Sequence, residues 1–233
     1  MTSATAADGP TLKPTAPPPT TTRHIAILTF DGFNQLDSFI ALGILNRIKR
    51  PDWRVSLCCP STAVTSMNGV VVRAQSLLED TRTADAVIVG SGMQTRDIAS
   101  SAALMGRLSL DPARQLIAAQ CSGTLILAKL GLLAGVSACT DLITAPWVKE
   151  AGVDVLNQPF HAHGNVATAG GCLASAYLAA WLIARTEGTA AAAAALHYVA
   201  PVGEKDRFVA NALNNITPYL PQQPAPAARR VGA

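Results

Sequence analysis

The sequence predicts an α/β fold, a three-layer sandwich in which a mostly parallel sheet is covered by helices on both faces. Short apolar runs of strand length alternate with segments of helical periodicity along residues 24–220. Many of the helical segments have ten or more residues, which is typical of crossovers between parallel strands. The sequence contains no internal repeat, and the size of the segment predicts one domain.

The first half of the segment begins with a buried strand, predicted from the β-branched and aromatic residues of HIAILTF. The following helix is predicted from apolar residues at helical spacing, and a later one has Asp97 in its first turn. The predicted order is a strand at 24–30, a helix at 36–48, a strand at 53–59, a hairpin around Asn68-Gly69, a strand at 84–90 and a helix at 95–108.

The second half contains the tightest predicted turn of the chain. The strand QLIAAQ ends abruptly at Cys121-Ser122-Gly123, and the apolar helix TLILAKLGLL follows at once. The elements predicted here are a strand at 115–120, a helix at 124–133, a strand at 136–140, a short helix at 145–152, a hairpin at 160–171 and helices at 172–185, 189–199 and 204–216.

Both ends of the chain differ from the middle in composition. Residues 1–23 are rich in proline and threonine, and residues 221–233 read PQQPAPAARRVGA. Neither segment offers an apolar face to bury, so both are predicted to be disordered tails.

The overall composition excludes several classes of protein. The 18 basic and 15 acidic residues are scattered, so no nucleic-acid surface is predicted. The sequence shows neither a membrane-spanning segment nor a signal-peptide pattern, which predicts a cytoplasmic protein without a membrane partner. Five cysteines without a C-x-x-C motif fit neither a disulfide framework nor a zinc site, so reduced thiols are expected.

Cys121 is the candidate nucleophile. It lies between a buried strand and the first turn of a helix, the setting of the nucleophile elbow in G-x-S-x-G hydrolases. The helix N-terminus is expected to lower the thiol pKa, and the N–H of Ser122 is expected to point toward a developing negative charge. The alternative is that Cys121 is a small buried apolar residue, as most free cysteines are, and Cys139 and Cys172 are interpreted in that way.

Four segments resemble the ThiJ/PfpI, or class I glutamine amidotransferase-like, superfamily, and most closely its isonitrile hydratase branch. They are IAILTFDGFNQLD, VGSGMQT, AAQCSGTLILAKLGLLAG and ATAGGCLASAYLAAWLIA, and the resemblance runs from Ile25 to Glu187. It implies a flavodoxin-like sandwich that forms a homodimer. It also implies that Asp37, in the Q-L-D motif, lies beside the nucleophilic thiol.

The resemblance further implies an oxyanion-binding turn at Gly90, Ser91 and Gly92, in which Ser91 replaces a usual glycine. Ser122 stands where the family usually has threonine, whereas protease-like members have histidine after the nucleophile. Several relatives carry a Thr-His pair where this chain has Thr140-Asp141. These departures disfavour a Cys-His peptidase or glutaminase and leave Asp37 as the candidate acid or base.

The resulting hypothesis is a cysteine-dependent isonitrile hydratase that needs no cofactor and takes a small-molecule substrate. The alternatives are a ligand-sensing or regulatory domain without catalysis, and a glyoxalase or deglycase-like enzyme. His161 and His163 alternate in a predicted strand and share one face as metal ligands would. A solvated hairpin is the favoured interpretation of these histidines because no third ligand is near them in sequence, so no metal is expected.

Overall fold

The computed structural model describes residues 22–221 and contains a seven-stranded sheet in the order β5-β2-β1-β6-β7-β9-β8. All pairings in this sheet are parallel except that of β8 with β9. The strands are β1 (Arg23–Leu28), β2 (Trp53–Cys59), β5 (Ser76–Leu77), β6 (Ala86–Val89), β7 (Leu116–Gln120), β8 (Phe160–His163) and β9 (Val166–Ala169). A separate antiparallel hairpin pairs β3 (Ala63–Thr65) with β4 (Val71–Arg73).

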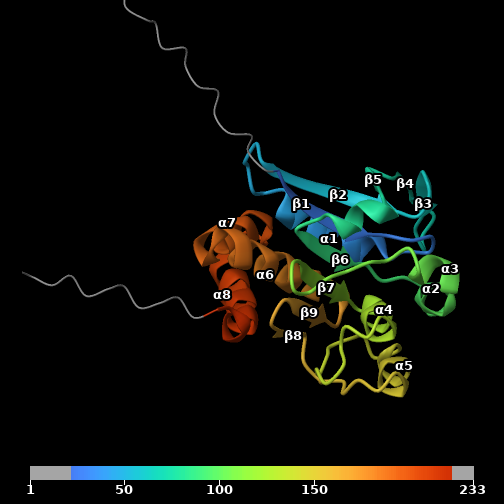
Figure 1. Ribbon diagram of the computed structural model, residues 1–233. Coiled ribbons are helices and arrows are strands. Elements are labelled where there is room, and N and C mark those ends of the chain that lie inside the picture. Colours follow the sequence, from blue (N-terminus) through green and yellow to red (C-terminus); the bar gives the residue numbers. More distant parts are fainter. Residues whose placement is uncertain (1–21, 222–233) are drawn as a thin grey trace, which may run out of the picture.

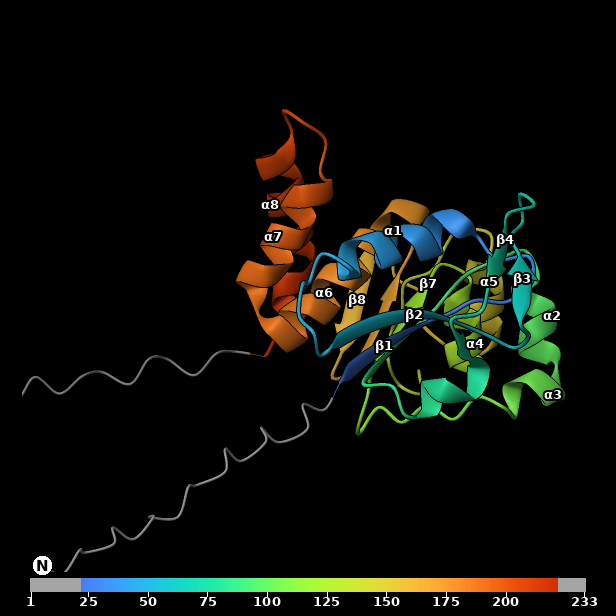
Figure 2. The ribbon, with the colours of Figure 1, turned by 90° about the horizontal axis from the view of Figure 1, so that it is seen from above.

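Helices cover both faces of the sheet, as predicted. They are α1 (Gln35–Leu45), α2 (Thr95–Ser100), α3 (Ala102–Met105), α4 (Gly123–Lys129), α5 (Ala145–Glu150), α6 (Ser175–Glu187), α7 (Thr189–Val199) and α8 (Lys205–Ile216). The helices α6 to α8 gather at one end of the molecule and α2 to α5 at the other (Figures 1 and 2). Within residues 22–221, no helix is both long and apolar enough to cross a bilayer.

The strands are apolar on both faces because each face has its own core. In β1, Ile25 and Ile27 belong to the core beneath α1, α6, α7 and α8, whereas Ala26 and Leu28 belong to the core beneath α2, α4 and α5. Successive side chains of a strand point to opposite faces, so both faces of β1 must be covered. This confirms the predicted three-layer sandwich.

The first strand begins one residue earlier than predicted. Arg23 is the first residue of β1 and pairs with Trp53 of β2. Its guanidinium lies 2.5 Å from a carboxylate oxygen of Glu187 and donates to the carbonyl of Thr186 at 3.1 Å. Apart from residues 22, 23 and 221, the tails predicted at 1–23 and 221–233 lie outside the described residues.

Two predicted elements differ in the structure. Residues 136–140 form no strand, and Ala138 makes only an isolated bridge to Val155, because β9 occupies the position beside β7. The helix predicted at 95–108 is divided into α2 and α3 at Ser101. Ser101 has an extended backbone, and its hydroxyl accepts a hydrogen bond from the N–H of Leu104 as the cap of α3.

The carboxyl ends of four adjacent parallel strands lie along one edge of the sheet. The loop after β1 leads to Asp37, the turn after β6 contains Ser91, and β7 is followed directly by Cys121. The end of β9 leads through two glycines to Cys172. Ligands bind at this edge in open α/β sheets, near the point where the strand order reverses.

Candidate active site

Cys121 occupies a strained turn between β7 and α4. Its φ of +46° is the only positive value among the non-glycine residues that the structure describes. This left-handed conformation is unfavourable for an L-residue and persists where the surrounding structure holds it. The N–H of Cys121 donates to Ala169 O at 2.8 Å, and its carbonyl accepts from the hydroxyl of Thr140 at 2.8 Å. The predicted elbow is therefore present and held on both sides.

Gly123 lets the elbow pack directly against the end of β6. A Cβ atom at this position would lie 2.5 Å from the carbonyl oxygen of Val89 and 2.7 Å from that of Gly90. No larger residue fits without moving the backbone. The close approach brings the turn after β6 next to the thiol-bearing turn.

Asp37 lies in the first turn of α1, but it does not cap the helix. Asn34 is the N-cap, and its side chain accepts from the N–H of Leu36. The carboxylate of Asp37 is buried, with 1% of the residue exposed, and its Oδ2 accepts a hydrogen bond from the hydroxyl of Ser91. Its Oδ1 has no hydrogen-bond partner among the described residues. A buried carboxylate oxygen without a partner is costly in a purely structural role.

Three side chains converge at this point. One ligand atom each from Asp37, Cys121 and Cys172 lies within 4.8 Å of the other two. Among residues 22–221, this is the only set of three or more histidine, cysteine or acidic side chains close enough to share a metal ion. His161 and His163 belong to no such set. His161 instead lies 3.3 Å from the hydroxyl of Tyr219 through its Nδ1.

Cys172 is the residue of the candidate site that the sequence analysis missed. It was interpreted as a small buried residue of the core. It is partly exposed, and the side-chain amide of Asn34 donates to its Sγ at 3.3 Å. A signal was present in Gly170-Gly171, which directly follow β9, the strand beside β7. A Cβ at Gly170 would lie 2.2 Å from the carbonyl oxygen of Thr140. Such close packing draws the following residue toward the elbow.

The electrostatics of Cys121 differ from the sequence-based expectation. Burial raises the pKa of its thiol, and the nearby Asp37 carboxylate raises it further, while a hydrogen bond from the Gln120 amide at 3.3 Å has a smaller opposing effect. The pKa of Cys172 is also raised, first by burial and then by Asp37. The expectation of a thiol pKa lowered by the helix N-terminus was wrong, and the resting thiol is protonated at neutral pH.

The turn after β6 offers one free backbone donor. The N–H groups of Gly90 and Gly92 are already used, because they donate to Leu28 O at 2.9 Å and to Ser122 Oγ at 3.1 Å. The N–H groups of Ser91 and Ser122 have no acceptor within the described part of the chain. These two amides are therefore the available donors for a developing negative charge.

The side chain of Ser122 faces the protein. Its Oγ lies 2.8 Å from the hydroxyl of Thr95, in addition to the contact with Gly92. Ser122 thus links the elbow to the turn after β6 and to α2. Asp141, which stands where several relatives carry histidine, accepts from the N–H groups of Ile143 and Thr144 at 3.0 and 2.9 Å and stabilises its own turn.

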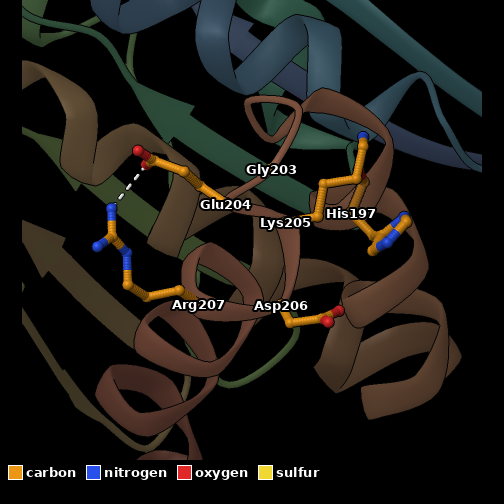
Figure 3. Close-up of a pocket in the computed structure, with 6 residues that line it drawn as sticks. All are labelled: His197, Gly203, Glu204, Lys205, Asp206 and Arg207. Atoms are coloured by element: carbon orange, nitrogen blue, oxygen red, sulfur yellow. Dashed lines mark hydrogen bonds and ion pairs between the residues drawn. The ribbon is translucent and has the colours of Figure 1, made fainter.

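Two cavities flank the three converging side chains. One has a volume of about 620 Å³ and is lined by Cys172 with Leu36, Phe39, Ile40 and Met67 among its apolar residues. The other, of about 920 Å³, includes Thr140, Gly170 and Gly171. A third hollow lies between α7 and α8, lined by His197 and residues 203–207 (Figure 3). That hollow contains none of the converging residues.

Comparisons with known proteins agree with this architecture. The model of the DJ-1/PfpI family matches residues 23–185. A THiJ/PfpI family protein from Pseudomonas syringae is 19% identical with a TM-score of 0.69, covering 89% of this chain and 96% of its own. A DJ-1 superfamily protein from Salmonella typhimurium is 25% identical with a TM-score of 0.65, covering 76% and 98%.

Drosophila melanogaster DJ-1beta is 18% identical with a TM-score of 0.67, covering 76% of this chain and 97% of its own. The search of curated proteins finds no match. The structural matches share the α/β fold, and the family model spans the strands and turns that carry Asp37, Cys121 and Cys172. The chain belongs to the DJ-1/PfpI family.

Proposed function

We propose that this protein is a cysteine-dependent isonitrile hydratase that converts isonitriles to N-formamides. The observation that carries the proposal is the pairing of a buried thiol with a buried carboxylate, Cys121 and Asp37, in a site without histidine. An isonitrile carbon accepts a nucleophile and then needs a proton. A thiol beside one carboxyl group supplies both.

The first step forms a thioimidate. The thiol of Cys121 gives its proton to Asp37 as the sulfur attacks the terminal carbon of the isonitrile. Asp37 then delivers that proton to the same carbon, and the product is R–N=CH–S–Cys121. Transfer during the attack fits the raised pKa of the thiol, because no stable thiolate needs to exist beforehand.

The second step releases the formamide. Asp37 accepts a proton from a water molecule whose oxygen attacks the thioimidate carbon, and it passes this proton to the nitrogen. The C–S bond of the tetrahedral intermediate then breaks as the hydroxyl proton passes through Asp37 to the departing sulfur, giving R–NH–CHO and the free thiol. The unpaired N–H groups of Ser91 and Ser122 would hydrogen-bond the developing oxyanion. The hydroxyl of Ser91 would keep Asp37 in place during both transfers.

The surroundings of Cys172 favour an apolar substituent on the isonitrile. The adjoining cavity of about 620 Å³ is lined by Leu36, Phe39, Ile40 and Met67, and its size suits an alkyl or aryl group. The polar residues Asn34, Gln35 and Asn68 form the remainder of its lining, together with Cys172. An aryl isonitrile is therefore the first substrate to test.

The test is formamide production from an aryl isonitrile by the purified protein under reducing conditions. Cys121→Ala should abolish turnover, and Asp37→Asn should lower it by at least about a hundredfold, as expected for a lost acid-base group. The matched control is Asp141→Asn, in which the amide oxygen can still accept the two backbone hydrogen bonds of that turn. Turnover that survives Asp37→Asn within a few fold would overturn the proposed role of Asp37.

A ligand-sensing domain is the second candidate function. The small exposed fraction of Cys121, 4%, and its protonated resting state suit a thiol that captures ligand without rapid turnover. Intact-mass measurement separates the two cases. An adduct on Cys121 that persists without formamide release supports sensing, and adduct turnover supports the hydratase.

A homodimer is proposed together with the hydratase. Leu36 and Met67, at the rim of the Cys172 cavity, and the neighbouring Leu173 are exposed apolar side chains, and a second copy would cover them. Light scattering on the purified chain measures the oligomeric state. A monomer at micromolar concentration would contradict this part of the proposal. The cytoplasmic location stays a prediction.

A further inference from the structure

The second cysteine of the site has no role in the proposed hydration. The sulfur atoms of Cys121 and Cys172 lie within 4.8 Å of one another, although the two residues are far apart in sequence. They meet because β7 and β9 are neighbours in the sheet and both residues follow the carboxyl ends of these strands. Among the remaining cysteines, Cys58, Cys59 and Cys139 are buried.

The local backbone lets Cys172 approach Cys121. Cys172 begins a single 3₁₀ turn, and it follows Gly171, which has a φ of +91° and open space where a Cβ would lie. Cys121 is held at the elbow by hydrogen bonds on both sides of its peptide unit. Closing the distance to the length of a disulfide therefore requires movement of Cys172 and its turn.

An oxidant can reach this pair. Cys172 is partly exposed and lines the cavity of about 620 Å³, so hydrogen peroxide can reach its sulfur, and the buried sulfur of Cys121 lies within 4.8 Å of that position. Asp37 lies within 4.8 Å of the same atoms, and its Oδ1 has no other partner among the described residues. The carboxyl group is thus placed to exchange protons with either thiol.

We propose that Cys121 and Cys172 form a reversible redox pair that reacts with peroxide, with Cys121 as the peroxidatic thiol and Cys172 as the resolving thiol. In the first step, the sulfur of Cys121 attacks one peroxide oxygen, after its proton passes to Asp37. The S–O bond forms, the O–O bond breaks, and the leaving hydroxide takes the proton from Asp37 to become water. The product is a sulfenic acid on Cys121.

The second step closes the disulfide. The sulfur of Cys172 attacks the sulfur of the sulfenic acid, the S–S bond forms and the S–O bond breaks. The leaving hydroxide combines with the proton of the Cys172 thiol, giving a second water. The two thiols are oxidised by two electrons and one peroxide is reduced to two waters. A dithiol reductant returns the pair to the starting state.

The disulfide protects Cys121 from irreversible oxidation. A sulfenic acid without a nearby thiol continues to the sulfinic acid, which ordinary reductants do not reverse. A neighbouring thiol competes with the second peroxide molecule for the same sulfur. The pair therefore predicts a reversible product in the native chain and an irreversible one when Cys172 is replaced.

Peptide mapping tests the proposal directly. Trypsin places Cys121 in peptide 115–129, Cys139 in 130–149, Cys172 in 150–185, and Cys58 with Cys59 in 55–73. The full chain is treated with hydrogen peroxide, blocked with N-ethylmaleimide and digested without reductant. The expected product is peptide 115–129 joined to 150–185 with the loss of two hydrogens, and dithiothreitol should separate the two.

Two variants make the test decisive. In Cys172→Ser, peptide 115–129 should instead gain two oxygens as the sulfinic acid, at least several times faster than in the native chain. Cys139→Ser is the matched control, and its cross-linked product should be unchanged. The proposal is overturned if the native chain yields no joined peptide, or if Cys121 becomes over-oxidised equally fast with and without Cys172.

This experiment uses no isonitrile, so its outcome is independent of the hydratase proposal. Formation of the disulfide in a chain that makes no formamide would leave the redox pair standing and remove the hydratase. Formamide production by the reduced chain, with no joined peptide after peroxide treatment, would support the hydratase and remove the redox pair. Both readouts can be obtained from the same preparation.

Discussion

The thiol of Cys121 is subject to two opposing electrostatic influences. The N-terminus of α4 favours a thiolate, but such a helix end contributes only about 0.3–1 kcal/mol, which is less than one pKa unit. Burial and a neighbouring carboxylate can together move a pKa by up to about 3–5 units. In Cys121 burial and Asp37 prevail, so the pKa rises and proton transfer must accompany the proposed attack on the isonitrile.

The first prediction isolates the contribution of Asp37. Asp37→Asn removes the negative charge beside the thiol, so the pKa of Cys121 should fall and its thiolate fraction at pH 8 should rise. Labelling of peptide 115–129 by iodoacetamide should therefore accelerate several-fold, because each pKa unit changes the thiolate fraction by about tenfold. The measurement is the labelling rate as a function of pH, and its midpoint should shift to lower pH.

Asp141→Asn provides the comparison for this experiment. Asp141 is not part of the converging group, and its carboxylate is engaged with the backbone of its own turn. Its replacement should leave the labelling of Cys121 unchanged. Equal rates for the native chain and Asp37→Asn would show that the carboxylate does not influence the thiol.

At the scale of elements, the elbow depends on close contacts between turns. Gly123 packs on the carbonyl groups at the end of β6, and a Cβ added to it would lie only 2.5 Å from Val89 O. Gly43, in the middle of α1, has no atom within 4 Å of the place that a Cβ would take, apart from its chain neighbours and the nearby backbone of its own helix. A side chain can therefore be added at Gly43 without a clash but not at Gly123, although both glycines lie in helices.

The second prediction uses this difference. Gly123→Ala should destabilise the protein by about 1–3 kcal/mol, the usual range for an overpacked position, because the contact is with backbone that cannot rotate away. Gly43→Ala should instead stabilise it by up to about 1 kcal/mol through helix propensity. Urea denaturation of both variants measures these changes. A Gly123→Ala protein as stable as the native chain would mean that the elbow can move away from β6.

Much of the element order could be predicted from apolar periodicity, because the buried strands are continuous apolar runs. Periodicity failed at Ser101, where a side-chain cap interrupts the predicted helix, and at 136–140, where an apolar segment runs beside the sheet without joining it. The strand β5 was not predicted, since Ser76 and Leu77 are too short a segment to show a pattern.

The site was predictable to the extent that its residues occur in local motifs. Cys121 follows from the strand, turn and helix pattern, and Asp37 follows from the family resemblance. Cys172 required knowledge that β9 lies beside β7, which no local pattern provides. The free N–H of Ser91 likewise depends on the acceptors used by its two glycine neighbours.

At the scale of the whole molecule, the cysteines link stability to alkaline pH. Burial raises the pKa of all five thiols, and that of Cys139 reaches about 12. Unfolding exposes these thiols and returns their pKa values to about 9.0. Between these values the unfolded chain loses protons that the folded chain retains, so the free energy of unfolding must fall as the pH rises.

The last prediction concerns the size of this effect at Cys139, which is fully buried and is not among the converging residues of the candidate site. Its stabilising contribution is complete below about pH 9 and is lost progressively as the pH approaches about 12. Between these pH values, one such thiol lowers the free energy of unfolding by about 1.4 kcal/mol for each pH unit. Cys139→Ala should therefore lose stability less steeply than the native chain.

The measurement is the free energy of unfolding by urea at pH 8, 9, 10 and 11, in the presence of a reductant. Cys139→Ala loses packing at every pH, so its curve should start below that of the native chain. The difference in free energy of unfolding between the two proteins should then narrow as the pH rises above 9. Above that pH, unfolding of the native chain releases the Cys139 proton, and the variant has no such proton to release. Parallel curves across this range would show that Cys139 titrates alike in the folded and unfolded states.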